Sequence, residues 1–197
     1  MTKSPSVFDL VSAREGHFRL ESGYHSALWL DLDSLFVDPS AISALVRNLA
    51  RGISGYQPSV VCGPLVGGAF LAQLVAKELG MDFAYTEKAA SDAAGGLYQT
   101  RYELPAAFRA GIRRKKVALV DDVMSAGSSL RATFATLQDL GAIPVVVGAL
   151  MVLGSKGETF FREHGIAVEA GERREYQVWD PAHCPHCASG TPLEKVG

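Results

Sequence analysis

VALVDDVMSAGSS, residues 117–129, is the stretch that decides the fold. Its first four residues are apolar without interruption, which predicts a buried strand of a parallel sheet. Two acids, Asp121 and Asp122, follow at the carboxyl end of that strand, where open α/β sheets bind ligands. The small residues Ser125–Ser129 then open a segment with helical spacing that stops at Gly141. The stretch therefore predicts a strand, a ligand-binding turn and a helix.

The turn has the groups that a phosphorylated sugar requires. Free backbone N–H groups and the helix dipole favour an anion at a helix N-terminus, and the hydroxyls of Ser125, Ser128 and Ser129 add further donors. Two adjacent carboxylates can accept hydrogen bonds from a vicinal diol or hold Mg²⁺ through water. An acidic turn with a serine helix cap is the purely structural alternative. Two acids followed by Ser-x-Gly-Ser-Ser in a strand–turn–helix context favour the ligand site.

Predicted strands and helices alternate outward from this stretch. We expect a short helix at 7–13, hairpin strands at 17–20 and 27–33, a helix from Asp38, a strand at 59–62, a helix to Leu79, strands at 82–86 and 144–153, and a flap hairpin at 87–103. This alternation predicts one α/β domain with a mainly parallel sheet and helices on both faces. Within it we expect a hood hairpin (1–36), a core (37–170) and a tail (171–197).

Composition narrows the class of protein. Of 197 residues, 48% are hydrophobic, and 20 Gly and 9 Pro indicate a packed globule with loops. A net charge of −2 gives no general attraction to nucleic acid or to an anionic membrane. No apolar run reaches the ~18 residues of a spanning helix, and the polar start MTKSPS is not typical of a signal peptide. With three Cys and no secretory context, we expect a reduced, cytoplasmic protein.

Three stretches, taken in order, resemble the orotate phosphoribosyltransferases among the type I phosphoribosyltransferases. They are GHFRLESGYHSALWLDL (16–32), VVCGPLVGGAFLAQLVAKELG (60–80) and the 117–129 stretch, and the tail CPHCASGTPLEKVG (184–197) is similar to some C-termini in that family. The resemblance implies transfer of ribose 5-phosphate from phosphoribosyl pyrophosphate (PRPP) to a base, most simply orotate, with release of pyrophosphate. It further implies Mg²⁺ carried with PRPP, a five-stranded parallel core with a hood, and a homodimer.

The turn at Gly63–Gly68 is the candidate second anion site, because it follows a strand, contains three Gly and opens a helix. Alone it is a weak signal, since such turns also serve packing. The predicted PRPP-binding residues are Gly63, Pro64, Leu65, Val66, Gly67, Asp121, Asp122, Val123, Met124, Ser125, Ala126, Gly127, Ser128 and Ser129. The predicted catalytic residues are Asp121, Asp122, Arg101 and Lys88, and the predicted base-binding residues are Ser125, Trp29 and Lys156.

The chain departs from the family's pattern at cationic positions. The family's turn Lys-Ser-Gly is Glu21-Ser22-Gly23 here, and residues 89–102 of the flap contain neither the Lys nor the His of the family. Lys156 stands where the family has an Arg for the orotate carboxylate, and it lacks bidentate geometry. Two interpretations stay open. Either Lys88 or Arg101 supplies the flap cation of an enzyme, for orotate or another base, or the protein only senses PRPP or nucleotides.

Cys184 and Cys187 have the C-x₂-C spacing of half a zinc site. The sequence shows no second such pair nearby, so a complete site would need His183, His186 or a second subunit. We therefore interpret the two residues as a reduced, partly exposed pair, and predict no metal bound directly by the protein at the catalytic site. The basic run at 113–116 is more typical of a solvated flank than of a nucleic-acid surface.

Overall fold

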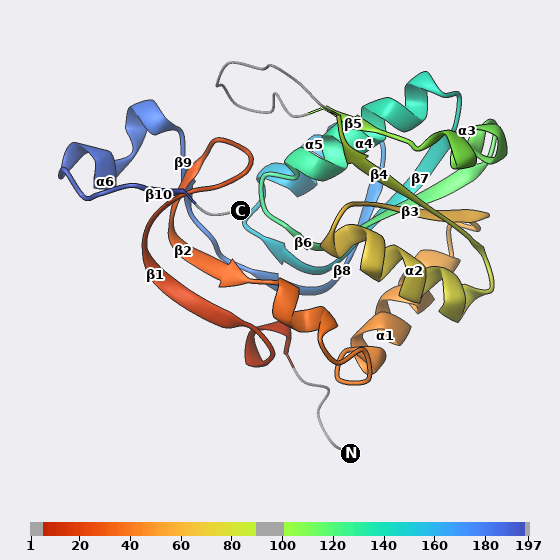
Figure 1. Cartoon of the computed structure of the whole chain (residues 1–197), viewed down its shortest axis with the longest axis horizontal. Helices are drawn as coiled ribbons and strands as arrows, with labels where there is room; N and C mark the ends of the chain where they lie inside the picture. Colours follow the sequence, from red (N-terminus) through yellow and green to blue (C-terminus); the bar gives the residue numbers. More distant parts are fainter. Residues whose placement is uncertain (1–5, 90–100, 196–197) are drawn as a thin grey trace.

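The centre of the computed structural model, which describes residues 6–89 and 101–195, is a six-stranded sheet (Figure 1). Its strands lie in the order β5 (Tyr102–Glu103), β4 (Asp82–Lys88), β3 (Val60–Pro64), β6 (Lys116–Met124), β7 (Ile143–Leu153) and β8 (Ala167–Arg174). The five strands from β4 to β8 in this order are parallel, and β5 pairs antiparallel with β4. The predicted α/β class and the five-stranded parallel core are thus confirmed.

Helices cover both faces of this sheet (Figure 1). One layer consists of α1 (Ser43–Ser54) and α2 (Gly67–Leu79), and the other of α3 (Ala106–Ile112), α4 (Ser128–Asp139) and α5 (Lys156–Glu163). Strand β6 shows why both layers are needed. Ala118 and Val120 pack with the first layer, Val117 and Leu119 with the second, and all four have no exposed surface. The unbroken apolar run is therefore the consequence of a strand buried on both sides.

A second sheet of four strands forms the hood beside the carboxyl ends of the core strands (Figure 1). Its hairpin consists of β1 (Ser12–Arg19) and β2 (His25–Asp31). Two short strands from the tail, β9 (Val178–Trp179) and β10 (Glu194–Lys195), pair with β2 and β1 respectively. The two ends of the chain thus build one structure.

Two sequence expectations about helices are corrected. The predicted helix at 7–13 is only a 3₁₀ turn, η1 (Val7–Asp9), closed by a capping box with Ser6, and β1 begins at Ser12. The helix expected from Asp38 begins at Ser43, since the Asp38 carboxylate accepts from the Ser40 N–H and holds a turn there. The described chain also contains short elements that the sequence did not indicate: η2 (Asp33–Phe36), η3 (Pro181–His183) and α6 (Pro185–Ala188).

The base of the predicted flap hairpin is present, because Lys88 is paired with Tyr102. The tip of the flap lies outside the described residues.

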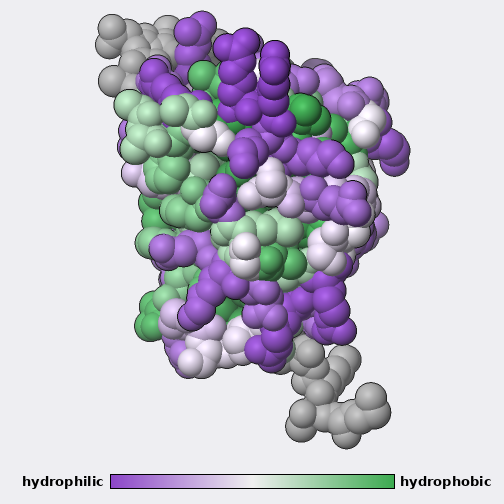
Figure 2. Space-filling model, turned by 90° about the vertical axis from the view of Figure 1, so that its right-hand side faces the viewer, coloured by the Kyte–Doolittle hydropathy of each residue, from purple (hydrophilic) through white to green (hydrophobic). Residues whose placement is uncertain are grey.

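The end of the core opposite the hood faces the viewer in Figure 2, where hydrophilic side chains cover much of the surface and alternate with smaller hydrophobic areas. The basic run at 113–116 leads into β6, whose first residue is Lys116, and is exposed. Within the described part of the chain, no helix combines the length and apolar character needed to cross a membrane.

Candidate active site

A cavity of about 420 Å³ lies where the carboxyl ends of β3 and β6 meet the hood. The β6 side contributes Asp121, Asp122, Val123 and Ser125–Ser129, and the β3 side contributes Pro64–Gly67. The hood and the remaining elements contribute Leu20–Ser22, Trp29–Asp33, Lys88, Tyr102, Leu153 and Tyr176. The fold therefore brings both predicted anion sites to one cavity, as expected for turns at the carboxyl edge of a parallel sheet. Of the predicted PRPP-binding residues, Gly63 and Met124 are buried and do not line it.

The two carboxylates at the end of β6 are held in place by hydrogen bonds. The Ser129 hydroxyl donates to Asp121 Oδ2 over 2.7 Å, and the Val123 N–H donates to Asp122 Oδ1 over 2.7 Å. Both residues are more than nine-tenths buried. Burial raises the pKa of Asp121 well above its ordinary value, and the neighbouring Asp122 raises it further. Burial also raises the pKa of Asp122.

These raised pKa values predict that Asp121 reduces the stability of the ligand-free protein at neutral pH. A carboxyl group whose pKa is higher in the folded chain binds its proton more tightly there, so folding stability falls as pH rises from the unfolded pKa, about 4, through the folded pKa. We therefore expect Asp121→Asn to raise the melting temperature at pH 8, with a gain that shrinks as pH falls towards about 4. Thermal unfolding across this pH range, with the exposed Asp82→Asn as control, measures the effect.

The same substitution is expected to weaken productive binding of Mg²⁺–PRPP by about 1–3 kcal/mol, the scale for losing a hydrogen bond to a charged group. Asp122→Asn should do likewise, while neither should change the binding of inorganic phosphate. Calorimetry with both ligands checks this. If both variants bind PRPP as the wild type does, the carboxylates have no part in ribose or metal binding.

Helix α4 begins at the predicted phosphate turn without a side-chain cap. Gly127, which precedes it, has φ +73°, a left-handed conformation that favours glycine. The N–H groups of the first helical turn have no partner within a helix, so they remain available to an anion. The Ser125 hydroxyl is buried at the cavity wall and has no hydrogen-bond partner within the described part of the chain. An unpaired buried hydroxyl is costly, which supports a ligand contact here.

The Gly63–Gly68 turn packs directly against the two carboxylates. A Cβ at Gly67 would collide with the Asp122 carboxylate, and a Cβ at Gly68 would lie 2.7 Å from Asp121 Oδ1. The peptide bond between Leu65 and Val66 is cis. A side chain at position 67 therefore has no room beside Asp122 as Asp122 is placed here.

Lys88 and Glu21 form an ion pair inside the cavity, with Lys88 Nζ 3.3 Å from Glu21 Oε1. The Tyr102 hydroxyl donates to the same carboxylate over 2.9 Å. Glu21, at the position of the family's Lys, thus holds a cation from the flap strand β4 instead of supplying one. The sequence indicated neither partner, because residues 21, 88 and 102 meet only through the tertiary structure.

The cavity is strongly acidic. Five carboxylates line it, those of Glu21, Asp31, Asp33, Asp121 and Asp122, and Lys88 is the one basic side chain among its described lining residues. A ligand with several phosphates would face repulsion from this lining without added positive charge. The carboxylate oxygens of Asp121 and Asp122 suit Mg²⁺ held through water. The residues present therefore fit a substrate that arrives with Mg²⁺.

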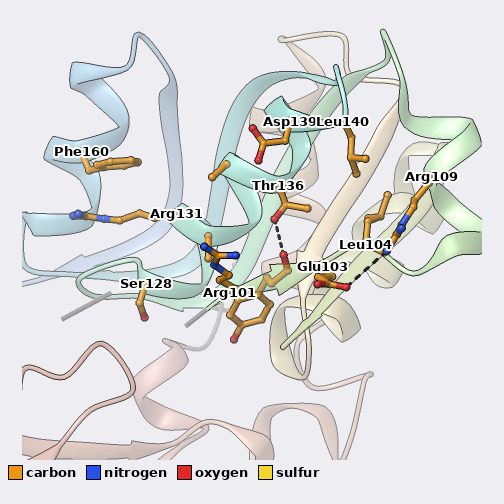
Figure 3. Close-up of a pocket in the computed structure, with 13 residues that line it drawn as sticks. Arg101, Glu103, Leu104, Arg109, Ser128, Arg131, Thr136, Asp139, Leu140 and Phe160 are labelled. Carbon is orange, nitrogen blue, oxygen red and sulfur yellow. Dashed lines mark hydrogen bonds and ion pairs between the residues drawn. The ribbon is translucent and has the colours of Figure 1, made fainter. Parts of the chain in front are cut away.

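Arg101, the other predicted catalytic cation, lies in a different place. It lines a groove of about 700 Å³ on the far side of α4, together with Arg109, Arg131 and Phe160 (Figure 3). The Arg131 guanidinium lies 4.2 Å from the centre of the Phe160 ring. Ser128 lines both the groove and the cavity, so the first turn of α4 separates the two. The catalytic role of Arg101 stays a prediction.

The three predicted base-binding residues are distributed over two spaces. Trp29 and Ser125 line the cavity. Lys156 lines an adjoining pocket of about 260 Å³, and its Nζ lies 4.9 Å from the centre of the Tyr24 ring. Leu153 and Tyr176 line both spaces. The binding of a base by these residues is untested.

The sequence pattern of the family described as phosphoribosyl transferase domain matches residues 36–183, about three quarters of the chain. The chain belongs to the phosphoribosyltransferase family. It is 33% identical over 186 residues to the orotate phosphoribosyltransferase of Thermotoga maritima. The aligned region covers 93% of this chain and 90% of that relative. The orotate phosphoribosyltransferase of Caldanaerobacter subterraneus is 30% identical over 183 residues, 93% of this chain and 89% of that relative.

Solved structures of other phosphoribosyltransferases share the fold. The orotate phosphoribosyltransferase of Aeropyrum pernix gives a TM-score of 0.62 at 23% identity, over 84% of this chain and 88% of that one. The Giardia lamblia adenine phosphoribosyltransferase (APRTase), complexed with 9-deazaadenine, gives a TM-score of 0.68 at 18% identity, over 86% of this chain and 98% of that one. The resemblance to orotate phosphoribosyltransferases is thus confirmed, and with it the predicted class of enzyme, a pentosyltransferase.

Proposed function

We propose that this phosphoribosyltransferase transfers ribose 5-phosphate from PRPP to orotate, giving orotidine 5′-monophosphate and pyrophosphate. The observation that carries the proposal is the meeting of an uncapped helix N-terminus, two buried carboxylates and a glycine-rich turn around one cavity roofed by the hood. A pentose with a phosphate at one end and a diphosphate at the other needs these three parts. The relatives named orotate phosphoribosyltransferase favour orotate as the base.

Each part has a role in binding PRPP. The 5′-phosphate lies against the N–H groups at the start of α4, with the Ser125 hydroxyl as a further donor. Asp121 and Asp122 accept hydrogen bonds from the ribose diol and hold Mg²⁺ through water. The diphosphate lies along the backbone of Pro64–Gly67. Trp29 in the hood and Tyr176 form the apolar sides of the space for the base.

The transfer breaks the bond between ribose C1 and a pyrophosphate oxygen, and the pyrophosphate leaves with the bonding electrons. A ring nitrogen of the base forms the new bond to C1. Mg²⁺ supplies positive charge to the leaving diphosphate when it is bound. Lys88 adds a cation held in position by Glu21, and the hood excludes water from the developing charge. The residues thus mainly position the substrates and stabilise the developing charge, and no covalent bond to the protein is formed.

One assay tests the proposal: pyrophosphate release from Mg²⁺–PRPP with orotate, uracil, purines and pyridine carboxylates. We expect turnover with orotate at least tenfold above every other base. Turnover with another base alone would reassign the substrate. Tight PRPP binding without pyrophosphate release from any base would make the protein a sensor. We further propose that the enzyme is a cytoplasmic homodimer, and its mass in solution tests the oligomeric state.

A further inference from the structure

Four potential metal ligands from the two ends of the chain meet at the hood. His17 and His25 lie on β1 and β2, and Cys184 and Cys187 lie in the tail around α6. Arg19 is the register partner of His25, and the strand register shifts between Glu15 and Phe18, where His17 lies. The two histidine rings meet there, with His17 Nε2 3.0 Å from His25 Nδ1. One ligand atom from each of the four residues lies within 4.8 Å of the others.

The distances fit a tetrahedral ion. Zn–N bonds of about 2.05 Å and Zn–S bonds of about 2.3 Å at tetrahedral angles imply edges of about 3.3 Å between two nitrogens and about 3.5 Å between nitrogen and sulfur. His17 Nε2 lies 3.0 Å from His25 Nδ1 and 3.4 Å from Cys184 Sγ. Cys187 Sγ lies 3.7 Å from His17 Nε2 and 3.3 Å from His25 Nδ1.

Hydrogen bonds alone do not account for this cluster. A carbonyl oxygen only accepts, so His17 Nδ1, 2.9 Å from Thr191 O, carries the hydrogen and donates it. Neutral His17 then has a single lone pair, on Nε2, while three polar atoms crowd around that nitrogen within 3.7 Å. One cation at the centre would satisfy all four ligands together. A backbone carbonyl that fixes the tautomer of a histidine is the usual support for such a ligand.

Burial and local structure point the same way. His17, His25 and Cys184 have 1%, 4% and 3% of their surface exposed. Between β9 and β10, Cys184 is the one buried residue, and the regular elements there are η3 of three residues and α6 of four. Elements this short cannot hold a fixed position through an apolar core of their own. A metal would fasten the tail to the hairpin.

We infer that His17, His25, Cys184 and Cys187 bind one structural Zn²⁺ per chain. Two thiolates and two neutral imidazoles in a tetrahedral arrangement are the set that selects zinc, and their charges neutralise the ion. The ligands that complete the C-x₂-C pair are therefore His17 and His25 from the hood, in place of the nearby His183 and His186 that the sequence offered. The ion ties the tail to the hairpin that carries Glu21 and Trp29 into the cavity.

Metal analysis of the tag-free protein, purified without chelator, tests the site. We expect about one zinc per chain in the wild type and in the control His183→Gln, which removes an adjacent histidine outside the cluster. Cys187→Ser and His25→Gln should retain less than about one fifth of that zinc. Cobalt substitution should give the intense visible bands and the thiolate charge-transfer absorption of a tetrahedral site with sulfur ligands.

A second measurement needs no variant. A pyridyl-amine chelator that removes zinc but leaves Mg²⁺ should lower the melting temperature of the wild type by roughly 5–10 °C, and added zinc should restore it. Protein that holds no zinc and gains no stability from it would overturn the inference. A count of one free thiol in denaturant, in place of three, would also overturn it, because Cys184 and Cys187 would then be a disulfide.

Discussion

Gly127→Val is expected to abolish binding of PRPP and of nucleoside 5′-monophosphates. Gly127 has φ +73° immediately before α4, and a β-branched residue is strained in that conformation. Relief of the strain would turn the first N–H groups of α4 away from the cavity. A Cβ at Gly127 would also lie 3.4 Å from Gly157 Cα and 3.5 Å from Met124 Cγ, so the valine methyl groups would press on the start of α5 and on β6. We expect a loss of more than a hundredfold in affinity, about 2.7 kcal/mol or more, measured by calorimetry.

Gly165→Val is the matched control for this substitution. Gly165 has φ +72° and open space around its Cβ position, and it lies between α5 and β8, away from the cavity lining. It therefore imposes the same backbone strain without approaching the phosphate. We expect Gly165→Val to lower stability and to leave affinity for PRPP unchanged. Undiminished nucleotide binding in folded Gly127→Val would refute the assignment of the phosphate site.

Lys88→Met is expected to lower kcat at least tenfold, about 1.4 kcal/mol or more, with a smaller effect on the affinity for PRPP. Lys88 is the one basic side chain among the described residues that line the cavity. In the proposed transfer it would stabilise the negative charge that gathers on the departing pyrophosphate. Methionine retains much of the side chain's length and removes its charge. The loss should therefore appear mainly in the chemical step, which single-turnover kinetics with orotate measures separately from binding.

Arg101→Ala separates the two candidate cations. The sequence predicted Arg101 as a catalytic cation as well, but the structure places it in the groove beyond α4. Unchanged turnover in Arg101→Ala together with a loss in Lys88→Met assigns the role to Lys88 alone. A tenfold loss in Arg101→Ala assigns a share to Arg101. Full activity of both variants would contradict a flap cation in catalysis.

Local sequence pattern and composition determined much of the core fold and of the candidate site. The apolar run 117–120 predicted a strand buried on both faces, and the acids and small residues after it predicted a ligand site at the carboxyl edge of a parallel sheet. Such signals survive in a sequence because a buried strand, a tight turn and a helix start each constrain neighbouring residues directly. Where local turns compete with a helix, the same reasoning gave a helix in place of a 3₁₀ turn at 7–13 and placed the start of α1 too early, at Asp38.

Only the tertiary structure decided which distant residues meet. In the sequence, Glu21 replaces a cationic residue of the family, which indicated that a positive charge was lost. In the fold, Glu21 forms an ion pair with Lys88 in the cavity. Cys184 and Cys187 looked like half a site, and the hood supplies His17 and His25 from more than 150 residues away. Long-range contacts depend on strand register and on how two sheets pack, which no local spacing encodes. The sequence therefore determined which chemical groups stand at the ends of the core strands. The packing of the hood against the core decided which distant residues those groups contact.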